Sequence, residues 1–103
     1  MSKILLLSKQ SFKQGFNDAS GYRKDDPTLK NIKPIEIEEL DEKFLEAKRN
    51  SVNKYNGNID NSKLDENFTR LIKDFSYRAG ILSAKNKPYP TPGLIISRAK
   101  KAY

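Results

Sequence analysis

The longest continuous pattern in this sequence is a helical one, over about residues 63–85. Ser62 and Asp65 stand at the spacing of a capping box at its start, and Pro88 limits it at the other end. The apolar positions that recur at steps of three and four residues are Leu64, Phe68, Leu71, Ile72, Phe75, Ala79 and Leu82. Such a helix has one apolar stripe that other elements must cover. The sequence therefore predicts a long helix with one apolar face over these residues.

Two shorter helices are predicted before it, over about 8–20 and about 41–54. Gly21 follows the first and Gly57 follows the second, and glycine is a typical residue just past a helix end. The positions that follow helical spacing in or next to these two segments are Phe12, Gly15, Phe16, Ala19, Leu40, Phe44, Ala47 or Lys48, Val52 and Tyr55. The predicted fold class is mainly α, a small domain of three to four helices.

Two short segments have patterns that also suit a β-strand. Residues 4–7 form an apolar run that begins at Ile4 and ends at Leu7, and residues 35–37 place an acidic side chain between Ile35 and Ile37. Apolar runs this short do not distinguish a strand from a helical turn. One two-stranded β pairing between the two segments is therefore an alternative to extra helix.

The C-terminal part has a different composition. Three prolines at alternate positions, Pro88, Pro90 and Pro92, favour an extended backbone, and Thr91 with Pro92 suits the start of a short last helix. We therefore divide the chain into a compact helical domain, 1–87, and a basic, proline-rich C-terminal extension, 88–103. The extension is expected to contribute more to binding than to folding unless its apolar residues 94–96 are buried.

Residues 11–19 align without gaps on residues 76–84, and Ser, Gly and Ala recur at equivalent positions. Glycine inside a helix costs about 1 kcal/mol relative to alanine. A helix that keeps glycine and alanine four residues apart on one face gains a close approach by another backbone. We therefore expect two helices to cross where Gly15 and Ala19 meet Gly80 and Ala84.

The composition argues against catalysis. The chain has 103 residues, enough for one modest core, and contains no cysteine and no histidine. It therefore lacks the commonest general base, the thiol nucleophile and the usual zinc ligands. We expect no enzymatic activity, cofactor, metal or small-molecule substrate. Because residues 4–7 are far too few for a signal peptide or a membrane span, we expect a cytoplasmic protein with no membrane partner.

The charge of +7 is unevenly distributed along the chain. Residues 1–35 carry seven basic and three acidic side chains, 36–74 carry seven and ten, and 75–103 carry six and none. Basic groups attract phosphates and aromatic rings stack on bases, so we single out candidate partner-binding residues of both kinds near the two ends. They are Phe12, Lys13, Tyr77, Arg78, Lys85, Lys87, Tyr89, Arg98, Lys100 and Lys101.

These features predict a small basic protein that acts by binding. The preferred partner is a nucleic acid or a ribonucleoprotein complex, although lysines outnumber arginines fifteen to five and no known nucleic-acid motif is present. One alternative is a phage or mobile-element protein that inhibits a host enzyme or a host defence complex by protein–protein binding. Another is a structural subunit of a virion or other large assembly.

Overall fold

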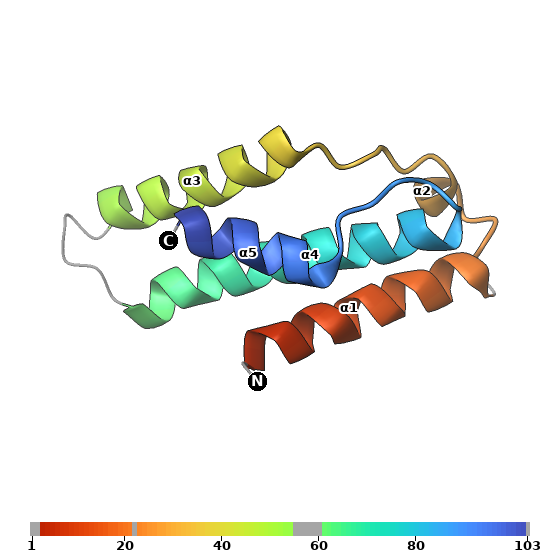
Figure 1. Cartoon of the computed structure of the whole chain (residues 1–103), viewed down its shortest axis with the longest axis horizontal. Helices are drawn as coiled ribbons and strands as arrows, with labels where there is room; N and C mark the ends of the chain where they lie inside the picture. The colour runs from red at the N-terminus through yellow and green to blue at the C-terminus, as the bar shows by residue number, and fades with distance from the viewer. Residues whose placement is uncertain (1–2, 22, 55–60, 103) are drawn as a thin grey trace.

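The computed structural model describes the backbone of residues 3–21, 23–54 and 61–102, and the side chains of 4–21, 23–49 and 66–102. The described residues form five helices and no strand. In chain order these are α1 (Lys3–Ser20), α2 (Pro27–Lys30), α3 (Ile37–Lys54), α4 (Asn61–Ala84) and α5 (Pro92–Ala102), as Figure 1 shows. The mainly helical fold class predicted from the sequence is confirmed.

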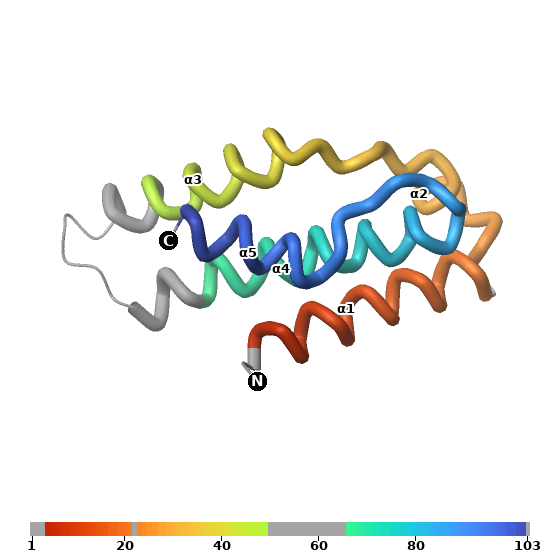
Figure 2. Tube along the Cα trace, viewed as in Figure 1, coloured from red at the N-terminus to blue at the C-terminus, as the bar shows by residue number. Residues whose placement is uncertain are grey.

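The four longer helices lie lengthwise in a molecule that measures 45 × 26 × 19 Å. Helices α1 and α4 run in the same direction, and α3 and α5 run opposite to them (Figure 1). Helix α4 contacts α1, α3 and α5, and α5 also contacts α1 and α3. In the Cα trace α5 lies between α1 and α3 (Figure 2). The long helix predicted from the apolar pattern is therefore the central one, and the other three cover it.

The main core lies where α3, α4 and α5 meet. Its aromatic centre is Phe44, whose ring stacks on Phe68 at 5.5 Å between centroids and is tilted against Phe75 at 5.9 Å. The buried members of the cluster are Ile35, Leu40, Phe44, Phe68, Ile72, Phe75, Ala79, Leu82, Ile95, Ile96 and Ala99. The described apolar positions of the 63–85 pattern are buried in it, except Leu71, which is half-buried against it.

The C-terminal segment contributes to this core. Ile95 is fully buried, Ile96 and Ala99 are nearly so, and all three belong to the main cluster. Complete burial of an aliphatic side chain of this size stabilises a fold by about 1.5–3 kcal/mol. Because residues 95 and 96 are buried, the C-terminal extension is part of the core. Helix α5 therefore has a role in folding as well as any role in binding.

The predicted β pairing is wrong. Residues 4–7 lie in α1, which begins at Lys3 rather than near residue 8, and Ile37 is the first residue of α3. Packing at helical spacing is the reason. Ile4, Ser8 and Phe12 lie on one face of α1, and this face packs against the rest of the protein. Ile35 is buried in the same core, in a segment that is neither helix nor strand.

Local sequence signals fix several helix ends. Helix α4 ends at Ala84, Asn86 follows in the left-handed region with φ of 59°, and the backbone N–H of Lys87 donates to the carbonyl of Leu82 at 2.9 Å. This is the Schellman arrangement, with asparagine in the position that glycine most often takes. Helix α5 begins at Pro92. Just before it, the Thr91 hydroxyl oxygen accepts a hydrogen bond from the backbone N–H of Leu94 at 3.2 Å. The short last helix predicted after Thr91 is confirmed.

The predicted crossing of α1 and α4 is confirmed by how closely their backbones approach. A Cβ atom added to Gly15 would collide with the carbonyl oxygen of Tyr77, and one added to Gly80 would collide with that of Phe12. The two contacts are equivalent in the internal repeat, because Phe12 aligns with Tyr77 and Gly15 with Gly80. The repeat therefore makes a parallel helix pair in which each glycine admits the backbone of the other helix.

Candidate functional site

The ten candidate residues lie on α1, α4, α5 and the 85–91 linker between the last two helices. They do not form one cluster. Phe12, Tyr77, Arg78, Lys85 and Arg98 are half-buried, and the remaining five are exposed: Lys13, Lys87, Tyr89, Lys100 and Lys101. Five of the candidates are thus partly covered by the rest of the protein, and five are largely exposed to solvent.

Tyr77 takes part in a polar network between α4 and the end of α1. Its hydroxyl donates to a carboxylate oxygen of Asp18 at 2.6 Å, and Asp18 also accepts from Gln14 at 2.7 Å and from Arg23 at 3.4 Å. The hydrogen bond from Tyr77 is the main cause that lowers the pKa of Asp18, against the opposing effect of burial. Burial, followed by the hydrogen bond to Asp18, raises the pKa of Tyr77. Tyr77 therefore has a structural partner of its own.

Both candidate arginines form ion pairs with α3. Arg78 donates from Nη1 to Glu39 at 3.0 Å, and its guanidinium lies 5.5 Å from the centroid of the Phe75 ring. The Nη1 of Arg98 lies 3.5 Å from a carboxylate oxygen of Asp41. Two acidic residues of α3 thus neutralise two of the candidate cations. Arg78 and Arg98 hold α4 and α5 against α3.

The exposed lysines that the structure describes on α1, the linker and α5 are cations without an ion pair. Within the described side chains, none of the following makes an ion pair: Lys9, Lys13, Lys87, Lys100 and Lys101. Lys9 was not among the candidates, although its position one turn before Lys13 was visible in the sequence. These lysines lie on α1, on the linker and on α5, and α1 contacts α5. The acidic side chains are concentrated on α3, on the far side of α5 from α1 (Figure 1).

Two aromatic rings are exposed beside these lysines. Tyr89, in the linker, is 42% exposed, and its ring lies against Phe12 with centroids 5.5 Å apart and planes inclined by 44°. Phe16, one turn after Phe12 on α1, is 40% exposed. Phe16 was expected on the packed face of its helix. It lies at the edge of that face instead, because Gly15 and Ala19 make the close approach to α4.

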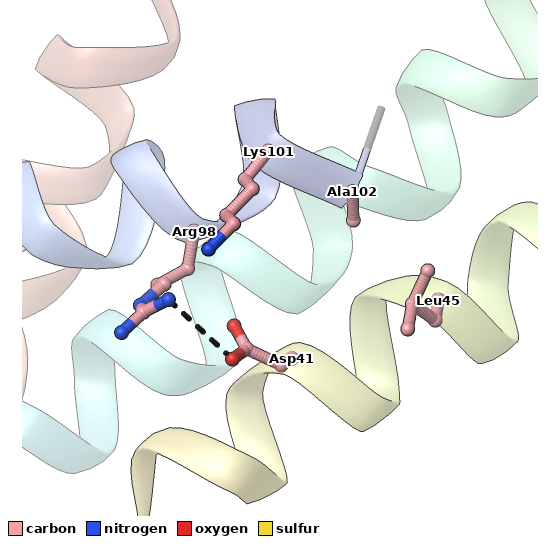
Figure 3. Close-up of a pocket in the computed structure, with 5 residues that line it drawn as sticks. All are labelled: Asp41, Leu45, Arg98, Lys101 and Ala102. Carbon is pink, nitrogen blue, oxygen red and sulfur yellow. Dashed lines mark ion pairs between the residues drawn. The ribbon is translucent and has the colours of Figure 1, made fainter.

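A cavity of about 230 Å³ lies between α3 and α5. Figure 3 shows Asp41 and Leu45 on α3 facing Arg98, Lys101 and Ala102 on α5. The Nε atom of Arg98 is buried without a hydrogen-bond partner, and Leu45 is 47% exposed. Because Asp41 already pairs with Arg98, the charge available to an anion here is that of Lys101. Lys101 is one of the five exposed, unpaired lysines of α1, the linker and α5, so the cavity alone offers an anion less positive charge than these lysines do together.

Neither a metal cluster nor a membrane span is found within the described residues. No three acidic side chains in this part of the chain are placed to hold a metal ion together. None of the described helices combines the length and apolar character needed to cross a bilayer.

No protein-family model, no curated protein and no solved structure matches this chain. The structure is that of a small helical protein in which the neighbouring helices α1 and α5 are basic, whereas α3 carries five acidic and four basic side chains. The surface features that distinguish it are the unpaired lysines and the two exposed rings.

Proposed function

We propose that this protein is a small, non-enzymatic binding protein that attaches to a nucleic acid or a ribonucleoprotein complex. The contact surface consists of the exposed, unpaired lysines of α1, the linker and α5: Lys9, Lys13, Lys87, Lys100 and Lys101. The observation that carries the proposal is the absence of opposing charge on these three segments. The linker and α5 contain no acidic residue, and the acidic residue of α1, Asp18, is buried beside Arg23.

The kind of cation favours contacts to the phosphate backbone. Lysine is a compact charge on a flexible stem, whereas arginine supplies the planar fork that reads carboxylates, phosphates and base edges in a fixed geometry. Here Arg23, Arg78 and Arg98 are engaged with carboxylates of the protein itself. The lysines that remain give attraction to a polyanion with little base discrimination. We therefore propose binding that depends weakly on base sequence.

The proposal is tested by reversing charge at two positions of this surface. A double variant with Lys13→Glu and Lys100→Glu should bind a mixed-sequence oligonucleotide more weakly, by a similar factor whatever its sequence, because phosphate contacts are lost. The matched control is Lys24→Glu with Lys30→Glu, two exposed lysines outside these segments, which changes the net charge by the same amount. Binding is measured by fluorescence anisotropy, with circular dichroism to confirm that both variants are folded.

Equal losses in the two double variants would mean that only the net charge matters, and would contradict a defined contact surface. Absence of oligonucleotide binding by the wild-type protein at low salt would contradict the proposed function altogether. The protein-binding alternative makes its own prediction for capture from host extract. Partners that stay bound to the protein after nuclease treatment would favour inhibition of a host complex or membership of an assembly.

A further inference from the structure

Two exposed aromatic residues lie on or against α1: Phe16 is part of this helix, and the ring of Tyr89 contacts Phe12 of the same helix. Large aromatic side chains usually contribute to stability by burial, yet these two are 40% and 42% exposed. Phe12 connects them. It lies one turn before Phe16 on α1, and its ring contacts that of Tyr89 at 5.5 Å between centroids. We refer to Phe12, Phe16 and Tyr89 together as the aromatic ledge; Phe16 and Tyr89 are its exposed members.

Two backbone segments restrict the ledge: the proline-rich linker that carries Tyr89, and helix α1, which carries Phe12. Tyr89 stands between Pro88 and Pro90, whose rings fix φ, and Pro90 is buried. Phe12 is anchored where α1 crosses α4, since its carbonyl group lies against Gly80. Little conformational freedom is left for Tyr89 to lose on binding, and a pre-organised ring binds more tightly than a free one.

Unpaired cations flank the ledge in the sequence. Lys13 follows Phe12, Lys9 lies one turn before Lys13 on α1, and Lys87 stands two residues before Tyr89. Exposed rings that alternate with cations are the combination by which proteins hold single strands, since bases stack on the rings while phosphates meet the cations. In a duplex the base faces are already stacked on one another and cannot reach a surface ring without unpairing.

We infer that the aromatic ledge is a stacking platform, so that the ligand of the basic surface is a single-stranded nucleic acid or an unpaired segment of a folded RNA. This inference rests on the proposed function and narrows its ligand class. Phe16 and Tyr89 each stack on one base, and Lys9, Lys13 and Lys87 contact the phosphates beside those bases. Phe12 supports Tyr89 from beneath and makes no base contact of its own.

The test compares ring removal with ring retention. Phe16→Leu and Tyr89→Leu remove a ring and keep an apolar side chain, whereas the controls Phe16→Tyr and Tyr89→Phe keep a ring. A mixed-sequence single-stranded oligonucleotide and the duplex of the same sequence are the probes, titrated by fluorescence anisotropy at one salt concentration. We expect the wild-type protein to prefer the single strand, each leucine variant to lose about 5- to 150-fold in affinity for it, and the controls to bind nearly as wild type.

The outcomes separate the two proposals. If the leucine variants bind the single strand as the wild type does while Lys13→Glu with Lys100→Glu binds weakly, the stacking platform is refuted and the proposed function stands. Tighter binding of the duplex than of the single strand also refutes the platform. If the leucine variants instead change only the oligomeric state, measured by sedimentation velocity, the ledge is a contact between copies of the chain. No binding of either probe by the wild-type protein overturns both proposals.

Discussion

Replacement of Gly80 by alanine is expected to destabilise the protein, although the same change in an exposed helix is stabilising. In a helix interior alanine is favoured over glycine by about 1 kcal/mol. At Gly80 the added Cβ would lie 2.8 Å from the backbone nitrogen of Phe16, and closer still to the carbonyl oxygen of Phe12. Both of these atoms belong to the backbone of α1, so no side-chain rotation can relieve the contact. The two helices would have to move apart.

The size of the effect follows from what this separation changes. Overpacking costs about 1–3 kcal/mol. Separation also weakens the buried hydrogen bond between the hydroxyls of Ser8 and Ser76, which are 2.5 Å apart, and a buried polar group left without its partner costs about 1–3 kcal/mol. After subtraction of the gain in helix propensity, the free energy of unfolding should fall by about 1–5 kcal/mol. For a domain of this size each kcal/mol lowers the melting temperature by about 4–8 °C.

Thermal unfolding followed by circular dichroism measures the change, and Gly93→Ala is the matched control. Gly93 also lies in a helix, α5, but a Cβ added there meets no atom within 4 Å. The control should therefore melt at the wild-type temperature or slightly above it. A Gly80→Ala protein as stable as the wild type would refute the close crossing of α1 and α4.

Two further predictions concern the polar network at Tyr77 and the role of α5. Because the pKa of Asp18 is lowered in the folded protein, its stabilising effect is present above its ordinary pKa of about 4 and is lost as the pH falls through the lower, folded value. Tyr77→Phe should therefore reduce stability at neutral pH and flatten the loss of stability in acid, whereas Tyr89→Phe, at an exposed residue, should change neither. Truncation after Lys87 removes the two buried isoleucines of α5, worth about 3–6 kcal/mol together, and should abolish the cooperative thermal transition. A truncated chain that still melts cooperatively near the full-length temperature would show that α5 is dispensable for folding.

Sequence patterns predicted the helices where several local signals agree. The segment 63–85 combines a capping pattern with regular apolar spacing, and α4 covers Asn61–Ala84. The pair Gly15 and Gly80 predicted a helix crossing because an interior glycine carries a cost that close packing explains. Residues 4–7 were ambiguous because four apolar residues fit either period. Their place in α1 is decided by contacts with residues far away in the chain.

The candidate site could be predicted only in part, because long-range ion pairs leave no local pattern. Arg78 stands four residues after Asp74, which suggests a pair within α4, yet its partner is Glu39 on α3. Arg98 was assigned to a partner because its own segment has no acid, and it pairs with Asp41. Among the candidate cations, both arginines are half-buried and four of the five lysines are exposed. The exposure of Phe16 depends on how α1 is rotated against α4, which spacing alone does not determine.

The salt dependence of oligonucleotide binding tests the central proposal most directly. The logarithm of the binding constant should fall linearly with the logarithm of salt concentration, since each lysine that neutralises a phosphate releases a counterion. Five contacts from Lys9, Lys13, Lys87, Lys100 and Lys101 predict a slope of about −3.5 for a single strand, and Lys13→Glu with Lys100→Glu should reduce it to about −2. A wild-type slope near zero, or a variant slope equal to that of the wild type, would contradict the assignment of these lysines to a phosphate-binding surface.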